Sequence, residues 1–244
     1  MNRSETPDLG RHNLEQQRYF ERSVKRTMVP RGTPYLRRHI SELLNFAGIS
    51  PGMRTLEVGC GMGRYTLLLA ELGMRVEGLD LTPFLLEKLA EFNAGRFHIP
   101  LHCADIIDHP PQLDGEFDAV VGFFVLHHLH DLERCFEATV RLARPGGRVV
   151  FVEPNAFNIL YYLQILLTPR MTWRGDRGVA RMRPGVVLPA MERAGLVKVK
   201  MDRFGFFPPM LANNPAGARV EAFLEAISIL RPILPFQIFC GERP

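Results

Sequence analysis

A glycine-rich stretch near residue 60 has the residue types and spacing that bind a ligand through the backbone. Residues 56–63 read LEVGCGMG, so an apolar run leads directly into three glycines. Without a Cβ, glycine lets a ligand approach the backbone closely and adopts positive φ freely. A helix that begins after such a loop offers free N–H groups to a carboxylate or phosphate. We therefore expect this stretch to bind an anionic group, with the carboxylate of Glu57 beside it.

Two further carboxylates stand where later apolar runs end. Asp80 follows the run that begins at Arg75, and Asp105 follows the run that begins at Ile99. A carboxylate at the end of the strand after a glycine-rich loop can bind both hydroxyls of a ribose. Asp105 is placed to accept a hydrogen bond from the amino group of an adenine. The alternatives are a helix-capping role for Asp80, an Asx turn at Asp105 and a solvated strand end at Glu57.

Three histidines, His127, His128 and His130, follow the fourth apolar run. His127 or His128 could act as a general base, because histidine titrates near neutral pH. The three histidines could instead bind a metal, but Asp131 is the only carboxylate near them at ligand spacing. The family resemblance described below implies a third interpretation, which we favour: this segment is a loop that closes over a bound cofactor. We expect no metal.

Glu153-Pro154-Asn155 stands at the end of the fifth apolar run. In a parallel sheet this position faces the same crevice as the glycine-rich loop. Glu153 and Asn155 are therefore candidates for contact with a substrate, although the same residues also make an ordinary strand stop before a proline.

Short apolar runs alternate with amphipathic segments through the middle of the chain, which predicts strands alternating with helices. The expected strands are Thr55–Val58, Arg75–Leu79, Ile99–Ala104, Phe117–Gly122 and Arg148–Glu153. The expected helices are Tyr65–Leu72, Thr82–Phe92 with Thr82 as N-cap, and Leu132–Leu142. This alternation indicates βαβ units on a parallel sheet, with ligands at the carboxyl ends of the strands.

The two ends of the chain depart from this alternation. Near the N-terminus a loosely periodic segment, Leu14–Lys25, precedes a helix over Tyr35–Phe46, which predicts an N-terminal helical cap. In the last third we expect a helix at Pro184–Ala194, strands at Val197–Phe204 and Phe236–Cys240, and between those strands a helix at Gly217–Leu230.

Three features separate a methyl donor site from a dinucleotide site. The glycines are spaced Gly-x-Gly-x-Gly, Glu57 stands two residues before the first of them, and Ala104-Asp105-Ile106 ends the third strand. Residues 144–148, RPGGR, are also expected to make a tight turn before the fifth strand. Together these residues resemble the class I S-adenosylmethionine-dependent methyltransferases, in particular the small-molecule branch called methyltransferase type 11. The resemblance covers Leu56 to Glu153.

The resemblance implies an α/β fold with a Rossmann-like, seven-stranded, mostly parallel sheet, helices on both faces and an antiparallel last strand. It implies S-adenosyl-L-methionine as cofactor, with Glu57 and the glycine loop at the methionine end and Asp80 at the ribose. The full set of expected cofactor-binding residues is Glu57, Gly59, Cys60, Gly61, Gly63, Thr66, Asp80, Leu81, Ala104, Asp105, Ile106, Phe123 and His128.

The expected activity is methyl transfer to oxygen, nitrogen or carbon of a small, partly apolar acceptor that can carry an anionic group. In-line displacement on an activated methyl group needs mainly positioning, with a base only where the acceptor holds its proton. The alternatives are a tRNA or rRNA methyltransferase, an NAD(P)-dependent oxidoreductase on a similar fold, and a non-catalytic cofactor-binding scaffold. Cofactor binding would separate the oxidoreductase from the others.

Specificity is expected to lie outside the central sheet. We place an N-terminal helical cap at residues 1–46 and a methyltransferase domain at 47–244, with lid insertions at about 155–183 and 206–232. The apolar segment that begins at Phe157 must cover the pocket, pair with another subunit or contact a membrane surface. The expected substrate or lid residues are Tyr19, Phe20, Glu153, Asn155, Tyr161 and Tyr162.

Composition sets broad limits on partners and location. The net charge is +4, but residues 3–38 carry nine Arg or Lys against four acids, and residues 170–203 carry nine against three. Such basic segments are either solvated faces or the surroundings of an anionic substrate, and they lack the aromatic clustering of a nucleic-acid groove.

The four cysteines show no Cys-x-x-Cys pair, which favours reduced thiols. We expect a cytoplasmic protein without a transmembrane segment, with a homodimer as one option.

Overall fold

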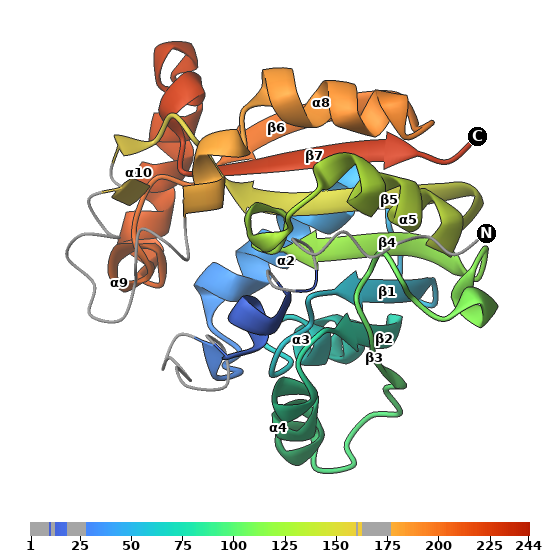
Figure 1. The fold of residues 1–244 in the computed structure, drawn as a ribbon. Helices are drawn as coiled ribbons and strands as arrows, with labels where there is room; N and C mark the ends of the chain where they lie inside the picture. The colour runs from blue at the N-terminus through green and yellow to red at the C-terminus, as the bar shows by residue number, and fades with distance from the viewer. Residues whose placement is uncertain (1–9, 11–12, 19–27, 160, 163–176) are drawn as a thin grey trace.

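A seven-stranded sheet forms the centre of the computed structural model, which describes residues 10, 13–18, 28–159, 161–162 and 177–244 (Figure 1). The strand order is β3-β2-β1-β4-β5-β7-β6. Neighbours from β3 to β5 pair in parallel, whereas β7 is antiparallel to both β5 and β6. The strands are β1 (Arg54–Val58), β2 (Arg75–Asp80), β3 (Leu101–Cys103), β4 (Phe117–Phe123), β5 (Ala143–Pro154), β6 (Val197–Phe204) and β7 (Phe236–Glu242).

Helices cover both faces of the sheet. Alternate residues of β4 and β5 point to opposite faces, so Val120 packs with one cluster of apolar side chains and Val121 with the other. The first cluster includes residues of α5 (Leu132–Leu142) and α8 (Pro184–Arg193), and the second includes residues of α2 (Pro34–Ala47) and α3 (Thr66–Glu71). Helix α4 (Pro83–Asn93) packs beside β2 and β3 (Figure 1). The predicted Rossmann-like α/β fold and its antiparallel last strand are confirmed.

The N-terminal part of α2 is fixed by local signals in the sequence. The side chain of Thr33 accepts a hydrogen bond from the Leu36 N–H, Pro34 occupies the first turn, and Gly48 ends the helix in the left-handed conformation at φ 67°. Leu36, Ile40 and Leu43 of this helix are buried against the sheet. Helix α2 therefore shares the core of the sheet, and the predicted domain boundary at residue 46 stays a prediction.

Several predicted elements differ from the structure. The helix expected at Gly217–Leu230 is α10 (Pro215–Glu225), followed by a separate 3-10 segment, η5 (Ser228–Ile233). The helix was expected because apolar residues, Val220 and Phe223 among them, recur at helical spacing, yet these two are 50% and 68% exposed, whereas Glu221 is 2% exposed. The apolar periodicity was therefore a wrong guide to the buried face of α10.

The turn expected before the fifth strand is also different. Residues 144–147 belong to β5, where the pairing with β4 shifts register between Phe117 and Ala119. Backbone hydrogen bonds join Gly146 and Gly147 to Arg243, the residue after β7. The segment therefore bulges away from β4 and stays paired with the chain at the end of β7. The third strand is shorter than predicted, and Thr82 begins α4 without a side-chain capping bond.

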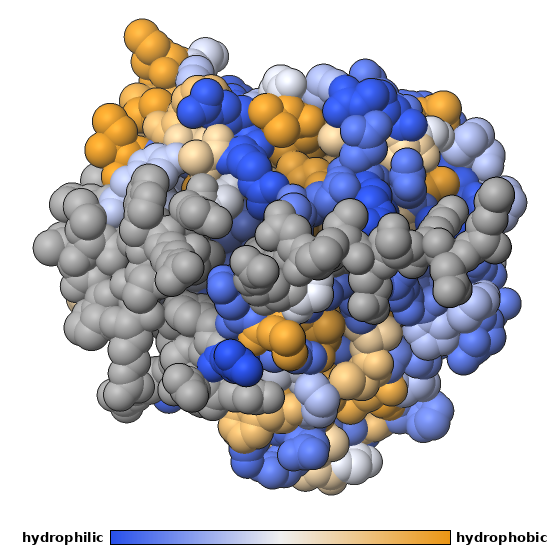
Figure 2. All heavy atoms as spheres, in the orientation of Figure 1, coloured by the Kyte–Doolittle hydropathy of each residue, from blue (hydrophilic) through white to orange (hydrophobic). Residues whose placement is uncertain are grey.

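The segment between β6 and β7 forms the second insertion, which contains α9 (Pro209–Ala212), α10 and η5. It lies at one end of the sheet (Figure 1), and apolar surface gathers there at the upper left of Figure 2. Met210 and Ile229 are 86% and 83% exposed. Within the described part of the chain, no helix is long and apolar enough to cross a membrane.

Candidate active site

The glycine-rich loop connects the end of β1 to α3 in a conformation that leaves room for a ligand. Gly59, Gly61 and Gly63 all have positive φ, at 68°, 52° and 85°. A Cβ on Gly59 would lie 2.4 Å from the Val125 side chain, so no larger residue fits there. A Cβ on Gly61 would meet nothing within 4 Å. The loop is therefore closed against the protein at Gly59 and open at Gly61, as expected of a backbone that cradles a bound molecule.

Glu57 lies at the end of β1 beneath this loop and is 2% exposed. The hydroxyl of Thr66, at the start of α3, donates a hydrogen bond of 2.6 Å to Glu57 Oε2. Burial raises the pKa of Glu57 to about 8, with a further contribution from the nearby charge of Asp80, while the Thr66 hydrogen bond opposes the rise. A cationic ammonium group beside Glu57 would favour the ionised carboxylate.

Asp80, at the end of β2, joins its own strand to the glycine loop. Its Oδ2 accepts a hydrogen bond of 2.9 Å from the Gly61 N–H, and its Oδ1 accepts one of 2.8 Å from the Thr82 N–H. Burial raises the pKa of this carboxyl, and these backbone hydrogen bonds oppose the rise. A carboxylate oxygen has capacity for a second hydrogen bond, so Asp80 keeps room for ribose hydroxyls.

Asp105 follows β3 and contacts the N-terminal segment of the chain. Its Oδ1 accepts a hydrogen bond from the Ile107 N–H, which is the Asx turn that the sequence allowed. Its Oδ2 accepts a hydrogen bond of 2.5 Å from Asn13 Nδ2. Four residues further along, Gln17 Nε2 donates to the Leu81 carbonyl at 2.9 Å. The described helical residues 13–18 thus lie over two positions that we expect to bind adenosine.

The other expected cofactor residues surround the same strand ends with different degrees of exposure. Phe123 is buried and stacks on Tyr65, with ring centroids 4.1 Å apart. Cys60 and Ile106 are each 3% exposed, and their side chains belong to apolar clusters of the core. Leu81, Ala104 and His128 are half-buried.

Glu153, at the end of β5, holds the segment after β4 in place. It is fully buried, and its Oε1 accepts hydrogen bonds of 2.7 Å from the N–H groups of Val125 and Leu126. Its Oε2 lies 2.7 Å from His127 Nδ1. Burial raises the pKa of Glu153 to about 7 against these opposing contacts. The predicted substrate residue thus contacts the loop histidine directly, an arrangement in which a carboxylate orients an imidazole.

Asn155 and Asn158 join the two insertions to each other. Asn155 Nδ2 donates to the carbonyls of Pro232 and Leu234, and Asn158 Nδ2 donates to that of Ile233. Asn155 Oδ1 also accepts from the Phe157 N–H. Because its amide group is used in this way, the structure favours a positioning role for Asn155 over the predicted substrate contact.

The remaining lid residues are only partly described. Tyr161 and Tyr162 are half-buried, and the Tyr162 hydroxyl donates to the Ala156 carbonyl at 2.9 Å. Tyr19 and Phe20 lie outside the described residues, as does the end of the apolar segment after residue 162. Among the described residues, no group of three or more His, Cys, Asp or Glu side chains is arranged to hold a metal.

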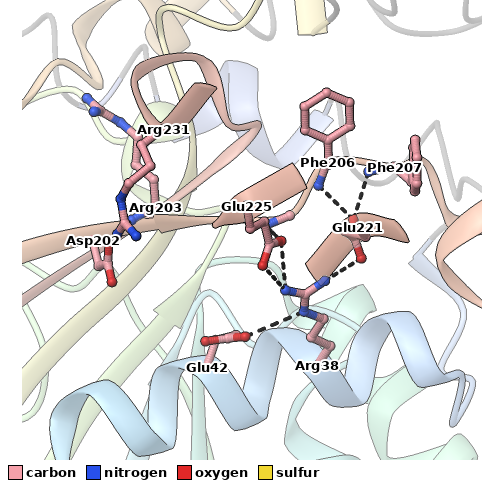
Figure 3. A network of polar contacts seen from close by, with 10 residues as sticks. Arg38, Glu42, Asp202, Arg203, Phe206, Phe207, Glu221, Glu225 and Arg231 are labelled. Carbon is pink, nitrogen blue, oxygen red and sulfur yellow. Dashed lines mark hydrogen bonds and ion pairs between the residues drawn. The ribbon is translucent and has the colours of Figure 1, made fainter. Parts of the chain in front are cut away.

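Sequence reasoning missed an ion-pair network that attaches the second insertion to α2. Arg38 of α2 pairs with Glu221 and Glu225 of α10 and with Glu42 on its own helix (Figure 3). Glu221 Oε1 also accepts hydrogen bonds from the N–H groups of Phe206 and Phe207, and Glu225 accepts one from Gly205. The glutamates at positions 221 and 225, one helical turn apart, were the available signal.

A cluster of aromatic rings around His39 was also missed. His39 lies on α2, is 2% exposed, and has its Nδ1 2.8 Å from the hydroxyl of Tyr65 at the start of α3. Four more rings surround it at centroid distances of 4.4 to 5.6 Å, from Tyr35, Phe236, Phe124 and Phe204. Phe124 has a positive φ of 57°, which is uncommon for a non-glycine residue and frequent at functional sites.

The cluster stands at the carboxyl edge of the sheet. Phe124 follows β4, Phe204 ends β6, and Phe236 begins the antiparallel β7. Tyr65 stands two residues after Gly63, the last glycine of the loop. In open α/β sheets this edge is where ligands bind.

Comparison with known proteins agrees with this geometry. A family model described as "Methyltransferase domain" matches residues 56–151. The chain is 30% identical over 163 residues to a ubiquinone biosynthesis O-methyltransferase of Chromobacterium violaceum, covering 64% of this chain and 70% of that protein. It is 32% identical over 165 residues to the protein of the same name from Methylococcus capsulatus, covering 64% and 68%.

Solved structures share the fold at lower identity. A phosphoethanolamine N-methyltransferase of Haemonchus contortus in complex with S-adenosyl-L-methionine superimposes with a TM-score of 0.61 at 16% identity. The match covers 85% of this chain and 52% of that one, so the chain spans about half the length of that structure. A possible histamine N-methyltransferase of Thermotoga maritima gives a TM-score of 0.61 at 16% identity, covering 96% and 97%.

The chain belongs to the class I S-adenosylmethionine-dependent methyltransferases. It is an enzyme that transfers a methyl group from S-adenosyl-L-methionine to a small molecule. The nicotinamide oxidoreductase, the nucleic-acid methyltransferase and the non-catalytic scaffold are not favoured by these similarities. The open backbone at Gly61 and the carboxylate of Asp80 beside it fit the cofactor of this class.

Proposed function

We propose that this enzyme methylates a phenolic hydroxyl of a small aromatic acceptor. The observation that carries the proposal is the ring cluster of Tyr35, Phe124, Phe204 and Phe236 at the carboxyl edge of the sheet. Aromatic side chains pack favourably against a planar ring. The names of the relatives, which are O-methyltransferases of ubiquinone biosynthesis, support a hydroxyl on such a ring.

The residues proposed to hold the cofactor are those at the first three strand ends. When bound, S-adenosyl-L-methionine supplies a methyl group activated by a positively charged sulfur. Glu57 with the glycine loop would hold its methionine end, Asp80 the ribose, and Asp105 the adenine edge. Asn13 and Gln17 would cover the adenosine from the outside, because they already contact Asp105 and Leu81.

A phenol must lose its proton to become a good nucleophile, since its pKa is about 10. We assign the base to His127, which Glu153 orients through a contact of 2.7 Å to Nδ1. His128, its half-buried neighbour at a ring distance of 4.0 Å, is the alternative. The assignment predicts that His127→Ala removes the acidic limb of the pH profile of kcat and that His128→Ala retains it. The reverse result would give the role to His128.

The insertions are proposed to form a lid over the acceptor, with Tyr161 and Tyr162 contacting it. Removing either ring by substitution with Ala should leave the affinity for S-adenosylhomocysteine within about threefold, well under a tenfold change, and lower kcat/KM for the acceptor far more. An equal loss of both would indicate a folding or assembly role. The homodimer and the cytoplasmic location stay predictions.

The proposed acceptor class can be tested directly. Purified full-length enzyme is supplied with S-adenosyl-L-methionine labelled on the methyl group and offered three panels of acceptors: phenols and catechols, amines, and carbon acids. Label transferred to a phenolic oxygen, identified by mass spectrometry of the product, is the expected result. Label found only in the amines or the carbon acids would overturn the proposal while leaving the methyltransferase class intact.

A further inference from the structure

His39 and Arg64 present buried N–H groups that no described residue uses. His39 Nδ1 is engaged by the Tyr65 hydroxyl, and its Nε2 is buried without a hydrogen-bond partner among the described residues. Arg64 stands between the glycine loop and Tyr65, and its Nε is also buried and unpartnered within the described chain. No carboxylate among the described residues lies within ion-pair distance of Arg64. A buried polar group without a partner is unfavourable, and a ligand that accepts its hydrogen bond recovers that loss.

The protonation states make both groups hydrogen-bond donors. Burial, with the positive charges of Arg64 and Arg38, lowers the pKa of His39 to about 3, so its ring is neutral at pH 7. Burial raises the pKa of Tyr65, so its hydroxyl keeps its proton and can donate to His39 Nδ1. The proton of the neutral imidazole is then on Nε2. The guanidinium of Arg64 adds a positive charge and carries only donors.

Aromatic rings surround His39, and the Arg64 guanidinium lies 5.4 Å from the centroid of the Tyr65 ring. Tyr35, Phe124 and Phe236 are half-buried, so their rings separate His39 from the surface. A ligand that fits here has an aromatic body and an oxygen that accepts hydrogen bonds and carries negative charge. A carboxylate meets both conditions, because its two oxygens can accept from two donors.

We propose that His39 and Arg64 bind a carboxylate on the ring of the acceptor, with Tyr65 as the positioning residue that fixes the imidazole. This rests on the proposed function, because it describes a second substituent of the aromatic acceptor, apart from the hydroxyl that is methylated. His39 and Arg64 are then specificity-determining residues, while His127 and Glu153 serve the reacting hydroxyl.

The test compares two acceptors that differ only in the carboxylate, 3,4-dihydroxybenzoate and catechol. The wild-type enzyme should have a KM at least about tenfold lower for 3,4-dihydroxybenzoate, the scale of one charge-assisted hydrogen bond. His39→Phe and Arg64→Met should remove this preference while kcat for catechol stays within about threefold. Tyr65→Phe should reduce the preference. As a control, Arg37→Met removes an exposed charge from α2, the helix that carries His39, and should keep the preference for 3,4-dihydroxybenzoate.

A second measurement does not depend on turnover or on the kinetic variants. Benzoate, which has no hydroxyl to methylate, is titrated into full-length enzyme loaded with S-adenosylhomocysteine and labelled with ¹⁵N-histidine. Movement of the His39 Nε2 resonance, assigned by its absence in His39→Phe, is expected. No movement at saturating benzoate, no binding of benzoate, or an unchanged acceptor preference in both His39→Phe and Arg64→Met would overturn the inference.

The outcomes separate this inference from the proposed function. Methylation of catechol without a preference for the carboxylate would overturn the carboxylate site and leave phenol methylation standing. Binding of benzoate at His39 without methylation of any phenol would support the site and overturn the proposed function.

Discussion

The carboxylate of Asp80 accepts a hydrogen bond of 2.9 Å from the backbone N–H of Gly61, so the end of β2 holds the tip of the glycine loop. The loop is thereby fixed before any ligand binds, at the position where a Cβ would meet only open space. A fixed backbone loses little entropy on binding, which favours affinity. The same carboxylate that is expected to bind the ribose therefore also shapes the methionine end of the site.

This relationship predicts a large effect of Asp80→Ala on cofactor affinity. Losing the ribose partner and loosening Gly61 should weaken binding of S-adenosylhomocysteine by about 1 to 3 kcal/mol, measured by calorimetry. Asp118→Ala is a matched control, because Asp118 also accepts a backbone hydrogen bond, from Arg54 at the opposite edge of the sheet. An equal loss of affinity in both variants would contradict a direct role for Asp80.

The raised pKa of Glu57 predicts how stability changes with pH. Its pKa in the folded protein, about 8, exceeds its ordinary value of 4.5. Its contribution to the free energy of unfolding is therefore fully present below pH 4.5 and is lost as pH rises toward 8. The stability of wild type relative to Glu57→Gln should therefore fall between pH 6 and 8, by at most about 1.4 kcal/mol per unit, and level off above 8. Urea unfolding of the cofactor-free protein at several pH values measures this.

Glu242 provides the control for that experiment. Hydrogen bonding to Lys198 holds the pKa of Glu242 below its ordinary value, opposed by desolvation and supported by Arg148. Its contribution is lost only as pH falls below about 4.5, so Glu242→Gln should differ from wild type by a constant amount from pH 6 to 8.5. A flat Glu57→Gln difference over the same range would show that Glu57 ionises normally.

The network around Arg38 predicts that the second insertion depends on α2. Arg38→Met would leave Glu221, which is 2% exposed, without its cation, and breaking a buried pair in this way costs about 3 to 5 kcal/mol. Arg37→Met on the same helix breaks an exposed pair with Glu71 and should cost less than about 1 kcal/mol. Unfolding in urea gives both values. Similar losses in the two variants would mean that the network around Glu221 adds no stability.

The hydrogen bond between Asn13 and Asp105 predicts that wild-type enzyme releases bound cofactor more slowly than a variant without the Asn13 amide. Removing the amide in Asn13→Ala loses a hydrogen bond to a carboxylate, so S-adenosylhomocysteine should dissociate about tenfold faster in stopped-flow measurements. Glu15→Ala alters an exposed residue of the same segment and should leave the rate unchanged. Slower dissociation from Asn13→Ala would instead mean that Asn13 competes with the adenine for Asp105.

The sequence by itself determined the class of the enzyme and which strand ends carry the residues proposed to bind the cofactor. Glycine spacing, Glu57, Asp80 and Asp105 lie at successive strand ends, and their meaning depends only on local backbone rules and on the parallel sheet that the alternation predicts. Strand positions followed from short apolar runs, because β4 and β5 are buried on both faces.

Tertiary structure decided what the side chains of the insertions and of α2 do. Val220 and Phe223 recur at helical spacing on α10 yet stay exposed. Glu221 is buried instead, because it pairs with the half-buried Arg38 and accepts hydrogen bonds from the N–H groups of Phe206 and Phe207. Likewise His39 and Tyr65 are 26 residues apart in the sequence, and they come into contact only because α2 and α3 pack on the same face of the sheet. Such contacts depend on the packing of distant segments, which neither periodicity nor motif spacing records.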